Sequence, residues 1–126
     1  MTDLCIERGK FLRGIAELAE SVYSFHSRFE IGCIDISDSA LALDILRQRL
    51  ALLDEEVGEH ARELNRGNVD KAIDEAVDIA YIALGTVLRL GLEGYDACLD
   101  VSRKNDAKSA STHGKRGGTG KIVARE

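Results

Sequence analysis

Apolar residues recur every three or four positions along three long segments, over about residues 11–29, 43–64 and 73–87. An apolar stripe with this spacing is typical of amphipathic helices that pack one face against a core. The chain also contains no proline, the residue that most strongly interrupts a helix. Aromatic residues make up 5% of the chain, which disfavours a sandwich or barrel of strands. We therefore expect an all-α protein.

Glycines near the ends of these segments mark the expected breaks between helices. Residues 35–39 have the composition of a loop with a helix N-cap, and Gly67 suits the left-handed position that ends a helix. Gly91 is expected to end the third helix. A fourth, weaker helix over about residues 94–109 would have an inner face of Tyr95, Cys98, Leu99 and Ser102. Short connections make an antiparallel four-helix bundle the default arrangement.

The last part of the chain has a different composition. From Ser109 onward it is rich in glycine and basic residues and has no amphipathic repeat. We expect a flexible tail over residues 109–126, with a short extended piece over 121–124, after a helical domain over residues 1–108. A chain of 126 residues buries a small core, which oligomerisation would help to complete.

Cysteine usage and hydropathy indicate the compartment. Cys5, Cys33 and Cys98 are odd in number, far apart and without a Cys-x-x-Cys motif, which argues against disulfides and a zinc knuckle. We expect three buried, reduced cysteines. No apolar run is long enough to span a bilayer, and the first residues lack the apolar core of a secretion signal. A cytoplasmic protein without a membrane partner is expected.

Charge is distributed unevenly along the chain. Residues 102–126 carry a net charge of +5, whereas residues 1–101 carry −10. An acidic body repels nucleic acid and attracts cations, so a nucleic-acid partner is not expected unless the tail alone binds it. The basic segment over residues 102–126 could then bind an anion that is held by the cations on the acidic body.

The third segment carries acidic groups in apolar surroundings. Residues 76–88 are apolar on nearly every side, with Asp78 as the only charge, and Glu75 falls on the same helix face. A helix of this composition is expected to be buried all round. A buried carboxylate is costly unless it is paired or binds a metal ion, and no Lys or Arg lies within a turn of Asp78.

The second segment supplies a matching pair of acids. Glu56 and Glu59 are three residues apart and share a helix face. In an antiparallel hairpin that turns at Gly67, Glu56 lies level with Asp78 and Glu59 with Glu75. Four carboxylates without histidine would form a hard oxygen site for Mg²⁺ or Mn²⁺. A di-iron bundle would need Glu-x-x-His pairs, which the chain lacks. Taken alone, Glu56 and Glu59 also fit a solvated helix face.

The pattern Glu56-x-x-Glu59, fifteen residues and Glu75-x-x-Asp78 resembles the signature of the MazG-like, all-α nucleoside triphosphate pyrophosphohydrolases. That superfamily includes the dimeric dUTPases and phosphoribosyl-ATP pyrophosphatase. The resemblance extends into residues 50–56 and 105–108 and covers about residues 20–110. It implies a MazG-like bundle, a homo-oligomer (dimer or tetramer) and Mg²⁺-dependent cleavage between the α- and β-phosphates of a nucleotide.

The resemblance also implies roles for individual residues. The implied metal ligands are Glu56, Glu59, Glu75 and Asp78. Glu55 would be the base that activates the attacking water, a role that its place beside the ligands allows. Asn105 and Lys108 resemble the family's phosphate-binding pair, with Arg103 and Lys104 as helpers. A solvated basic helix end is the alternative for these four.

The base-binding residues are less sharply defined by the sequence. His26, with Phe25 and Phe29, is a candidate for stacking on the nucleobase and hydrogen-bonding to it. The apolar stripe favours a core position for both phenylalanines, and His26 fits a surface or capping role equally well.

The expected activity is hydrolysis of nucleoside triphosphates, chiefly deoxynucleoside triphosphates, to the monophosphate and pyrophosphate, in a house-cleaning role. Phosphoribosyl-ATP pyrophosphatase is the alternative within the same fold. Outside enzymes, a non-catalytic helical module with a structural cation remains open, as does a nucleic-acid binder that uses its tail.

Overall fold

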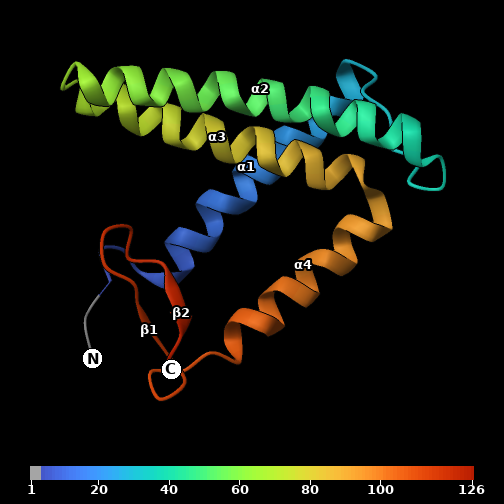
Figure 1. Ribbon diagram of the computed structural model, residues 1–126. Coiled ribbons are helices and arrows are strands. Elements are labelled where there is room, and N and C mark those ends of the chain that lie inside the picture. Colours follow the sequence, from blue (N-terminus) through green and yellow to red (C-terminus); the bar gives the residue numbers. More distant parts are fainter. Residues whose placement is uncertain (1–3) are drawn as a thin grey trace. The chain divides into compact units, whose positions relative to one another are not determined.

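The computed structural model describes residues 4–126, and these form helices with little strand (Figure 1). The expectation of an all-α protein is confirmed. The elements are α1 (Arg8–Arg28), α2 (Ser39–Asn65), α3 (Val69–Arg89), α4 (Gly91–Asp106), β1 (His113–Lys115) and β2 (Ile122–Ala124). The chain divides into two compact units, Met1–Gly91 and Leu92–Glu126. Nearly all of α4 therefore groups with the hairpin in the second unit.

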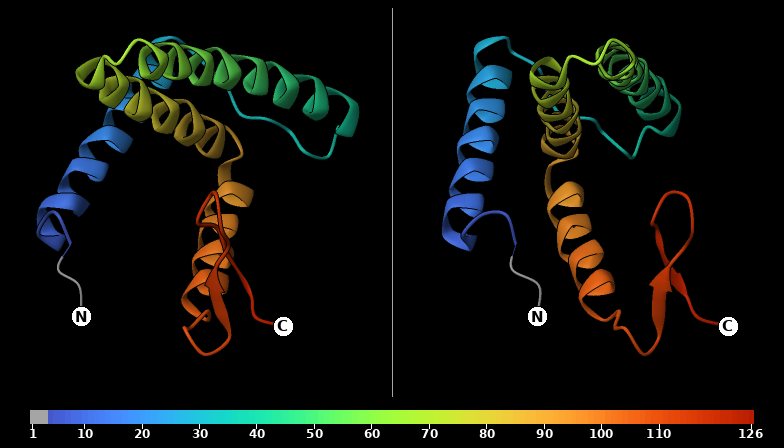
Figure 2. Two further views of the ribbon diagram at one scale, coloured as in Figure 1. Left: turned by 60° about the vertical axis from the view of Figure 1, so that its left-hand side comes forward. Right: turned by 90° about the vertical axis from the view of Figure 1, so that its left-hand side faces the viewer.

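In the first unit, α2 and α3 run side by side as an antiparallel hairpin, and α1 packs across α3 (Figures 1 and 2). The side chain of Asp38 caps α2 by accepting a hydrogen bond from the backbone N–H of Leu41 at 3.2 Å, as expected for this loop. The pairing of α2 with α3 is the structural basis of the site described below.

The turn between α2 and α3 has the expected glycine cap. Gly67 has a φ of 75°, a left-handed conformation that costs glycine little. The N–H of Asn68 donates to the carbonyl of Glu63 at 3.0 Å, and the N–H of Gly67 donates to that of Leu64 at 3.1 Å, which together make a Schellman motif. The Glu63 carboxylate also accepts from Asn68 Nδ2 at 2.8 Å and Arg66 Nη1 at 3.2 Å. These bonds, chiefly that from Asn68, lower the pKa of Glu63.

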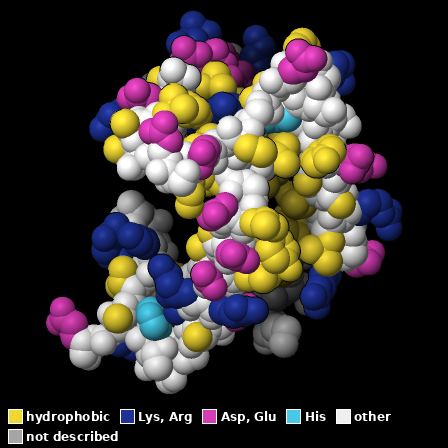
Figure 3. Space-filling model, turned by 90° about the vertical axis from the view of Figure 1, so that its right-hand side faces the viewer, with side chains coloured by type: hydrophobic (Ala, Val, Ile, Leu, Met, Phe, Trp, Pro, Cys, Tyr) yellow, Lys and Arg dark blue, Asp and Glu magenta, His cyan; other side chains and the backbone are white. Residues whose placement is uncertain are grey.

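The first unit buries few apolar side chains. Among the described residues, the buried apolar ones are Val22, Ile34, Ala42 and Ala72. The expectation that α3 is buried all round is wrong for the single chain, because Ile73 is 57% and Val77 46% exposed. Figure 3 shows how widely hydrophobic side chains reach the surface on one face. One copy of the chain has too few helices around α3 to cover it.

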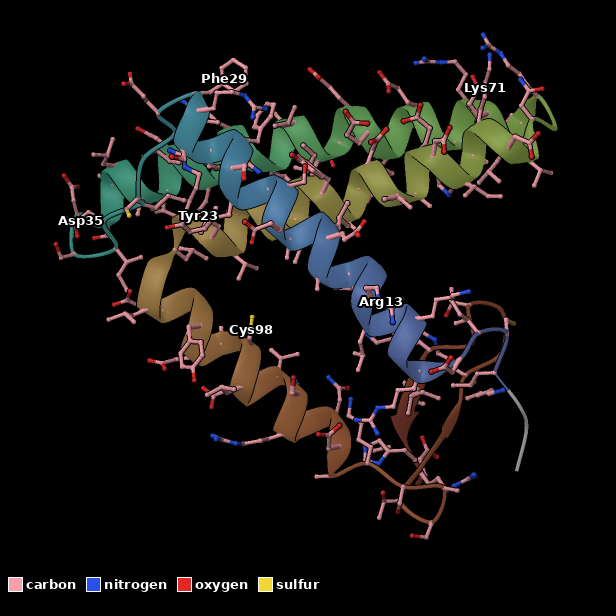
Figure 4. The ribbon with its side chains drawn as sticks, turned by 180° about the vertical axis from the view of Figure 1, so that it is seen from behind. Arg13, Tyr23, Phe29, Asp35, Lys71 and Cys98 are labelled. Carbon is pink, nitrogen blue, oxygen red and sulfur yellow. The ribbon has the colours of Figure 1, made fainter. Side chains whose placement is uncertain are left out.

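Helix α4 and the cysteines also differ from expectation. Tyr95, Cys98, Leu99 and Ser102, expected as an inner face, are all exposed, and Gly94 is the buried residue of α4. The cysteines are free but exposed rather than buried, and Figure 4 shows Cys98 on α4. A spacing of three and four residues identifies a possible contact face, but it does not guarantee a partner for it.

Part of the segment expected as a flexible tail forms an antiparallel hairpin, in which His113 pairs with Ala124 and Lys115 with Ile122. The short extended piece expected over 121–124 corresponds to β2. Between the strands, Gly118 and Gly120 adopt positive φ. Within residues 4–126, no helix has the length and apolar character needed to cross a membrane.

Candidate metal and nucleotide site

Three of the four predicted carboxylates come together between α2 and α3. One oxygen each of Glu56, Glu75 and Asp78 lies within 4.8 Å of the other two, and we call these three residues the acidic cluster. Glu75 and Asp78 are one turn apart on α3, and Glu56 faces them from α2. The charge of Glu59 also acts on Glu75, so the fourth acid borders the cluster. The register about Gly67 predicts this arrangement.

Burial within the cluster differs from the expectation for Asp78. Asp78 is exposed, whereas Glu56 and Glu75 are half-buried. The shielded group is Glu75, whose Oε2 is buried and has no hydrogen-bond partner among the described residues. A buried oxygen without a donor is unfavourable, and an incoming cation would satisfy it.

The pKa values of Glu75 and Glu56 are raised by their surroundings. The pKa of Glu75 rises from 4.5 to about 7, first because it loses solvation and then because Glu59, Asp78 and Glu56 surround it with negative charge. Loss of solvation also raises the pKa of Glu56, and the charges of Glu59 and Asp78 add to the rise. The cluster therefore holds a proton near neutral pH unless a cation replaces it.

No basic side chain neutralises the cluster within the described residues, since none of its three carboxylates forms an ion pair there. Clustered carboxylate oxygens without a cationic partner fit a hard divalent cation such as Mg²⁺ or Mn²⁺. Glu55 is exposed and adds its charge beside Glu56. This placement leaves the Glu55 carboxylate accessible to a water molecule.

Helix α1 contributes hydroxyl and aromatic groups one turn beyond Asp78. The hydroxyl oxygens of Ser21 and Tyr81 lie 3.1 Å apart, and the Tyr81 ring stands edge-on to that of Phe25 at 6.1 Å between centroids. The sequence analysis did not select Tyr81. Its position three residues after Asp78, on the same helix face, is the signal that could have identified it.

Arg49 is a second residue that the sequence analysis missed. It is buried between α2 and α3, where its Nη2 donates to the carbonyl of Ile82 at 2.7 Å and its Nε to Thr86 Oγ1 at 3.0 Å. Loss of solvation, and then the charge of Arg89, lower the pKa of Arg49. The sequence does contain a signal for this position, because Arg49 lies three residues after Leu46 and four before Leu53, on the apolar face of the helix.

Gly85 allows Arg49 to approach His26 of α1. A Cβ at residue 85 would lie 2.6 Å from Arg49 Nη2 and 2.8 Å from His26 Cε1, so a larger side chain would force both to move. The Nδ1 of His26 donates to the carbonyl of Val22 at 2.9 Å, which leaves its Nε2 as the free ring position. That Nε2 is buried without a partner among the described residues.

The two candidate base-binding residues, His26 and Phe29, differ in burial. His26 is 6% exposed and lines a hollow of about 260 Å³ that Arg89 and Tyr23 also line. Phe29 is 59% exposed, lies at the end of α1 (Figure 4) and does not line this hollow. Its ring packs against Phe25 at 4.7 Å between centroids.

The four candidate phosphate-binding residues lie at the C-terminal end of α4 and just after it. Lys108 Nζ donates to Asn105 Oδ1 at 3.1 Å, and Asn105 Nδ2 donates to the carbonyl of Val101 at 2.9 Å. Arg103 makes an exposed ion pair with Asp100 at 3.9 Å, and Lys104 is exposed. The amide of Asn105 therefore holds the ammonium of Lys108 in place.

Comparison with known proteins gives one family match. The model of the phosphoribosyl-ATP pyrophosphohydrolase (PRA-PH) family matches residues 35–105, more than half of the chain. The chain belongs to this family, and thus to the MazG-like nucleoside triphosphate pyrophosphohydrolase superfamily and to a family of hydrolases. The matched segment contains Glu55 and all four predicted ligands. Neither the curated proteins nor the solved structures include a significant match.

We expect Glu75→Gln to flatten the pH dependence of metal-free stability. Native Glu75 keeps its proton up to about pH 7, while the unfolded chain loses it near 4.5. The wild-type free energy of unfolding should therefore fall as pH rises from about 5 to 8. Urea unfolding across this range measures the slope, with the exposed Glu20→Gln as the matched control. Equal slopes in wild type and Glu75→Gln would contradict the assignment.

Proposed function

We propose that this protein is a Mg²⁺-dependent nucleotide pyrophosphohydrolase on a MazG-like helical scaffold, which converts a nucleoside triphosphate to the monophosphate and pyrophosphate. One observation carries the proposal: the acidic cluster holds three carboxylates, one with a pKa of about 7, without a cationic partner among the described residues. Membership of a pyrophosphohydrolase family supports it.

The chain's own residues would divide the work as follows. Glu56, Glu75 and Asp78, with Glu59 at their edge, would hold Mg²⁺ or Mn²⁺. A bound ion of this kind lowers the pKa of water and neutralises charge on phosphates. Glu55 would accept the proton of the attacking water. The water oxygen forms a bond to phosphorus, the bridging P–O bond between the α- and β-phosphates breaks, and pyrophosphate leaves.

Two further groups of residues would bind the rest of the nucleotide. Lys108, held by Asn105, would contact phosphate oxygens, with Arg103 and Lys104 nearby on α4. His26 would contact the base through its free Nε2, because a buried ring nitrogen without a partner favours a ligand that can pair with it. The exposed Phe29 would add a stacking surface at the end of α1.

We consider two main substrate classes for this reaction. Deoxynucleoside triphosphates fit a house-cleaning enzyme of the cytoplasm, which is the role we favour. Phosphoribosyl-ATP is the second candidate, because the matching family carries that description. Chromatography of the products formed from each substrate distinguishes the two.

We further propose that the working form is a homo-oligomer, a dimer or tetramer. Large apolar side chains remain exposed on all three helices of the first unit, among them Phe11, Leu64 and Ile73. Exposure on this scale favours association with a second copy. We expect sedimentation velocity to show at least a dimer at micromolar concentration. A monomer across that range would contradict this part of the proposal.

The activity is tested by pyrophosphate release from a panel of ribo- and deoxyribonucleoside triphosphates, dUTP and phosphoribosyl-ATP, with Mg²⁺ and with EDTA. We expect metal-dependent release from at least one substrate. Glu55→Gln should reduce turnover by about a hundredfold or more without weakening metal binding, because it removes the proton acceptor but no ligand. Asp54→Asn, which changes the neighbouring acid, is the matched control.

Other outcomes would favour the alternatives. Metal binding without turnover on any substrate would support a non-catalytic module with a structural cation. Unchanged turnover in Glu55→Gln would remove this residue from the mechanism.

A further inference from the structure

A hollow in the second unit is lined by basic side chains. It has a volume of about 680 Å³ and lies between the end of α4 and the β1–β2 hairpin. Its charged and polar lining includes Lys108, Lys115, Arg125, His113 and Asn105, and none of the described residues that line it is acidic. We call it the C-terminal hollow. Within the described residues, Lys108, Lys115 and Arg125 form no ion pair.

The hairpin holds Arg125 in a defined position. Its Nε donates to the carbonyl of Ala110 at 2.9 Å, and its backbone N–H donates to the carbonyl of Thr112 at 2.9 Å. A Cβ at residue 114 would lie 3.0 Å from the guanidinium carbon, so Gly114 leaves room for the guanidinium to lie against β1. The two terminal nitrogens of Arg125 remain available for a ligand.

On the α4 side of the hollow, hydrogen bonds hold Asn105 and Lys108 in position. Asn105 uses its amide nitrogen on the carbonyl of Val101 and its oxygen on Lys108 Nζ, so it acts as a positioning residue for that ammonium group. Lys115 is fixed at its backbone, because β1 pairs it with Ile122. Three cations thus line one hollow, and none of them forms an ion pair with another described residue.

We propose that the C-terminal hollow binds the phosphate chain of a nucleotide, with Lys115, Arg125 and His113 of the hairpin acting beside Lys108. A linear oligophosphate offers several negative oxygens, and a guanidinium binds such groups in a bidentate manner. The choice of a nucleotide as the source of the phosphates rests on the proposed function. The family match ends at residue 105, so the hairpin lies outside the matched segment.

Free oligophosphate is favoured over a nucleic-acid backbone. Nucleic-acid binders present cations along an open stripe, whereas these cations line a hollow. The strong negative charge of residues 1–101 also opposes a long polyanion.

The test uses the full-length protein, depleted of metal ions and titrated with inorganic tripolyphosphate in a calorimeter. We expect Lys115→Gln and Arg125→Gln each to weaken binding by about tenfold or more, because each removes a charged donor from the hollow. Lys121→Gln is the matched control: it removes the same charge from the same hairpin, but Lys121 does not line the hollow. It should change the affinity less than twofold. Lys115→Gln is the cleaner variant, since its side chain makes no hydrogen bond with described residues.

Three results would overturn the inference. The first is no binding of tripolyphosphate by the wild type, and the second is equal weakening by Lys121→Gln, which would show diffuse attraction. The third is tighter binding of a single-stranded oligonucleotide at the same salt concentration, which would indicate a nucleic-acid surface.

The inference and the proposed function can fail separately. A Glu56→Gln/Asp78→Asn variant should lose hydrolysis but retain the metal-free affinity for tripolyphosphate. Nucleotide hydrolysis without tripolyphosphate binding would overturn the inference alone. Binding that depends on Lys115 and Arg125, in a protein that hydrolyses no nucleotide, would support the hollow as a phosphate site and overturn the proposed function.

Discussion

The antiparallel pairing of α2 with α3 about Gly67 determines which charged groups meet in the first unit. The hydrogen bonds from the backbone N–H groups of Gly67 and Asn68 determine where α2 ends. The Glu63 carboxylate stabilises the turn by accepting a hydrogen bond from the Asn68 side chain. From there the register brings Glu56 to Asp78 and Glu75. The same register continues two turns further and brings Arg49 to Gly85, an equal number of residues from the turn on either side. The register set by this turn thus places both the acidic cluster and the buried Arg49 between α2 and α3, about two helical turns apart.

Electrostatic repulsion within the cluster opposes folding, and no basic side chain among residues 4–126 forms an ion pair that would relieve it. Glu75 instead keeps a proton to about pH 7. A metal ion would replace that proton and would satisfy the buried Oε2 of Glu75. The crowded carboxylates destabilise the metal-free protein, and the same crowding would favour binding of a cation. This conflict between stability and function is why a metal-dependent role explains the site better than a solvated acidic face does.

Much of this arrangement could be predicted from the sequence, because helical period and turn chemistry are local. The helices, the Asp38 cap, the left-handed Gly67 and the meeting of Glu56 with Glu75 and Asp78 all follow from spacing. Burial could not be predicted in the same way. Val77, Cys98 and Tyr95 look internal by spacing but are exposed, because burial depends on how many elements surround a face. Arg49 and the hairpin cations were missed for a related reason: their role depends on contacts between segments far apart in the sequence.

The most direct test of the central claim is the number of protons released when Mn²⁺ binds to the metal-free protein. Calorimetric titrations in two buffers of different ionisation enthalpy give this number at each pH. Because Glu75 has a pKa of about 7, we predict release of roughly one proton per ion at about pH 6 and almost none at about pH 8.5. In Glu75→Gln, the number of protons released per ion should be the same at the two pH values. Binding with no proton release at either pH, or binding that survives Glu56→Gln/Asp78→Asn unchanged, would contradict the assignment of the acidic cluster as the metal site.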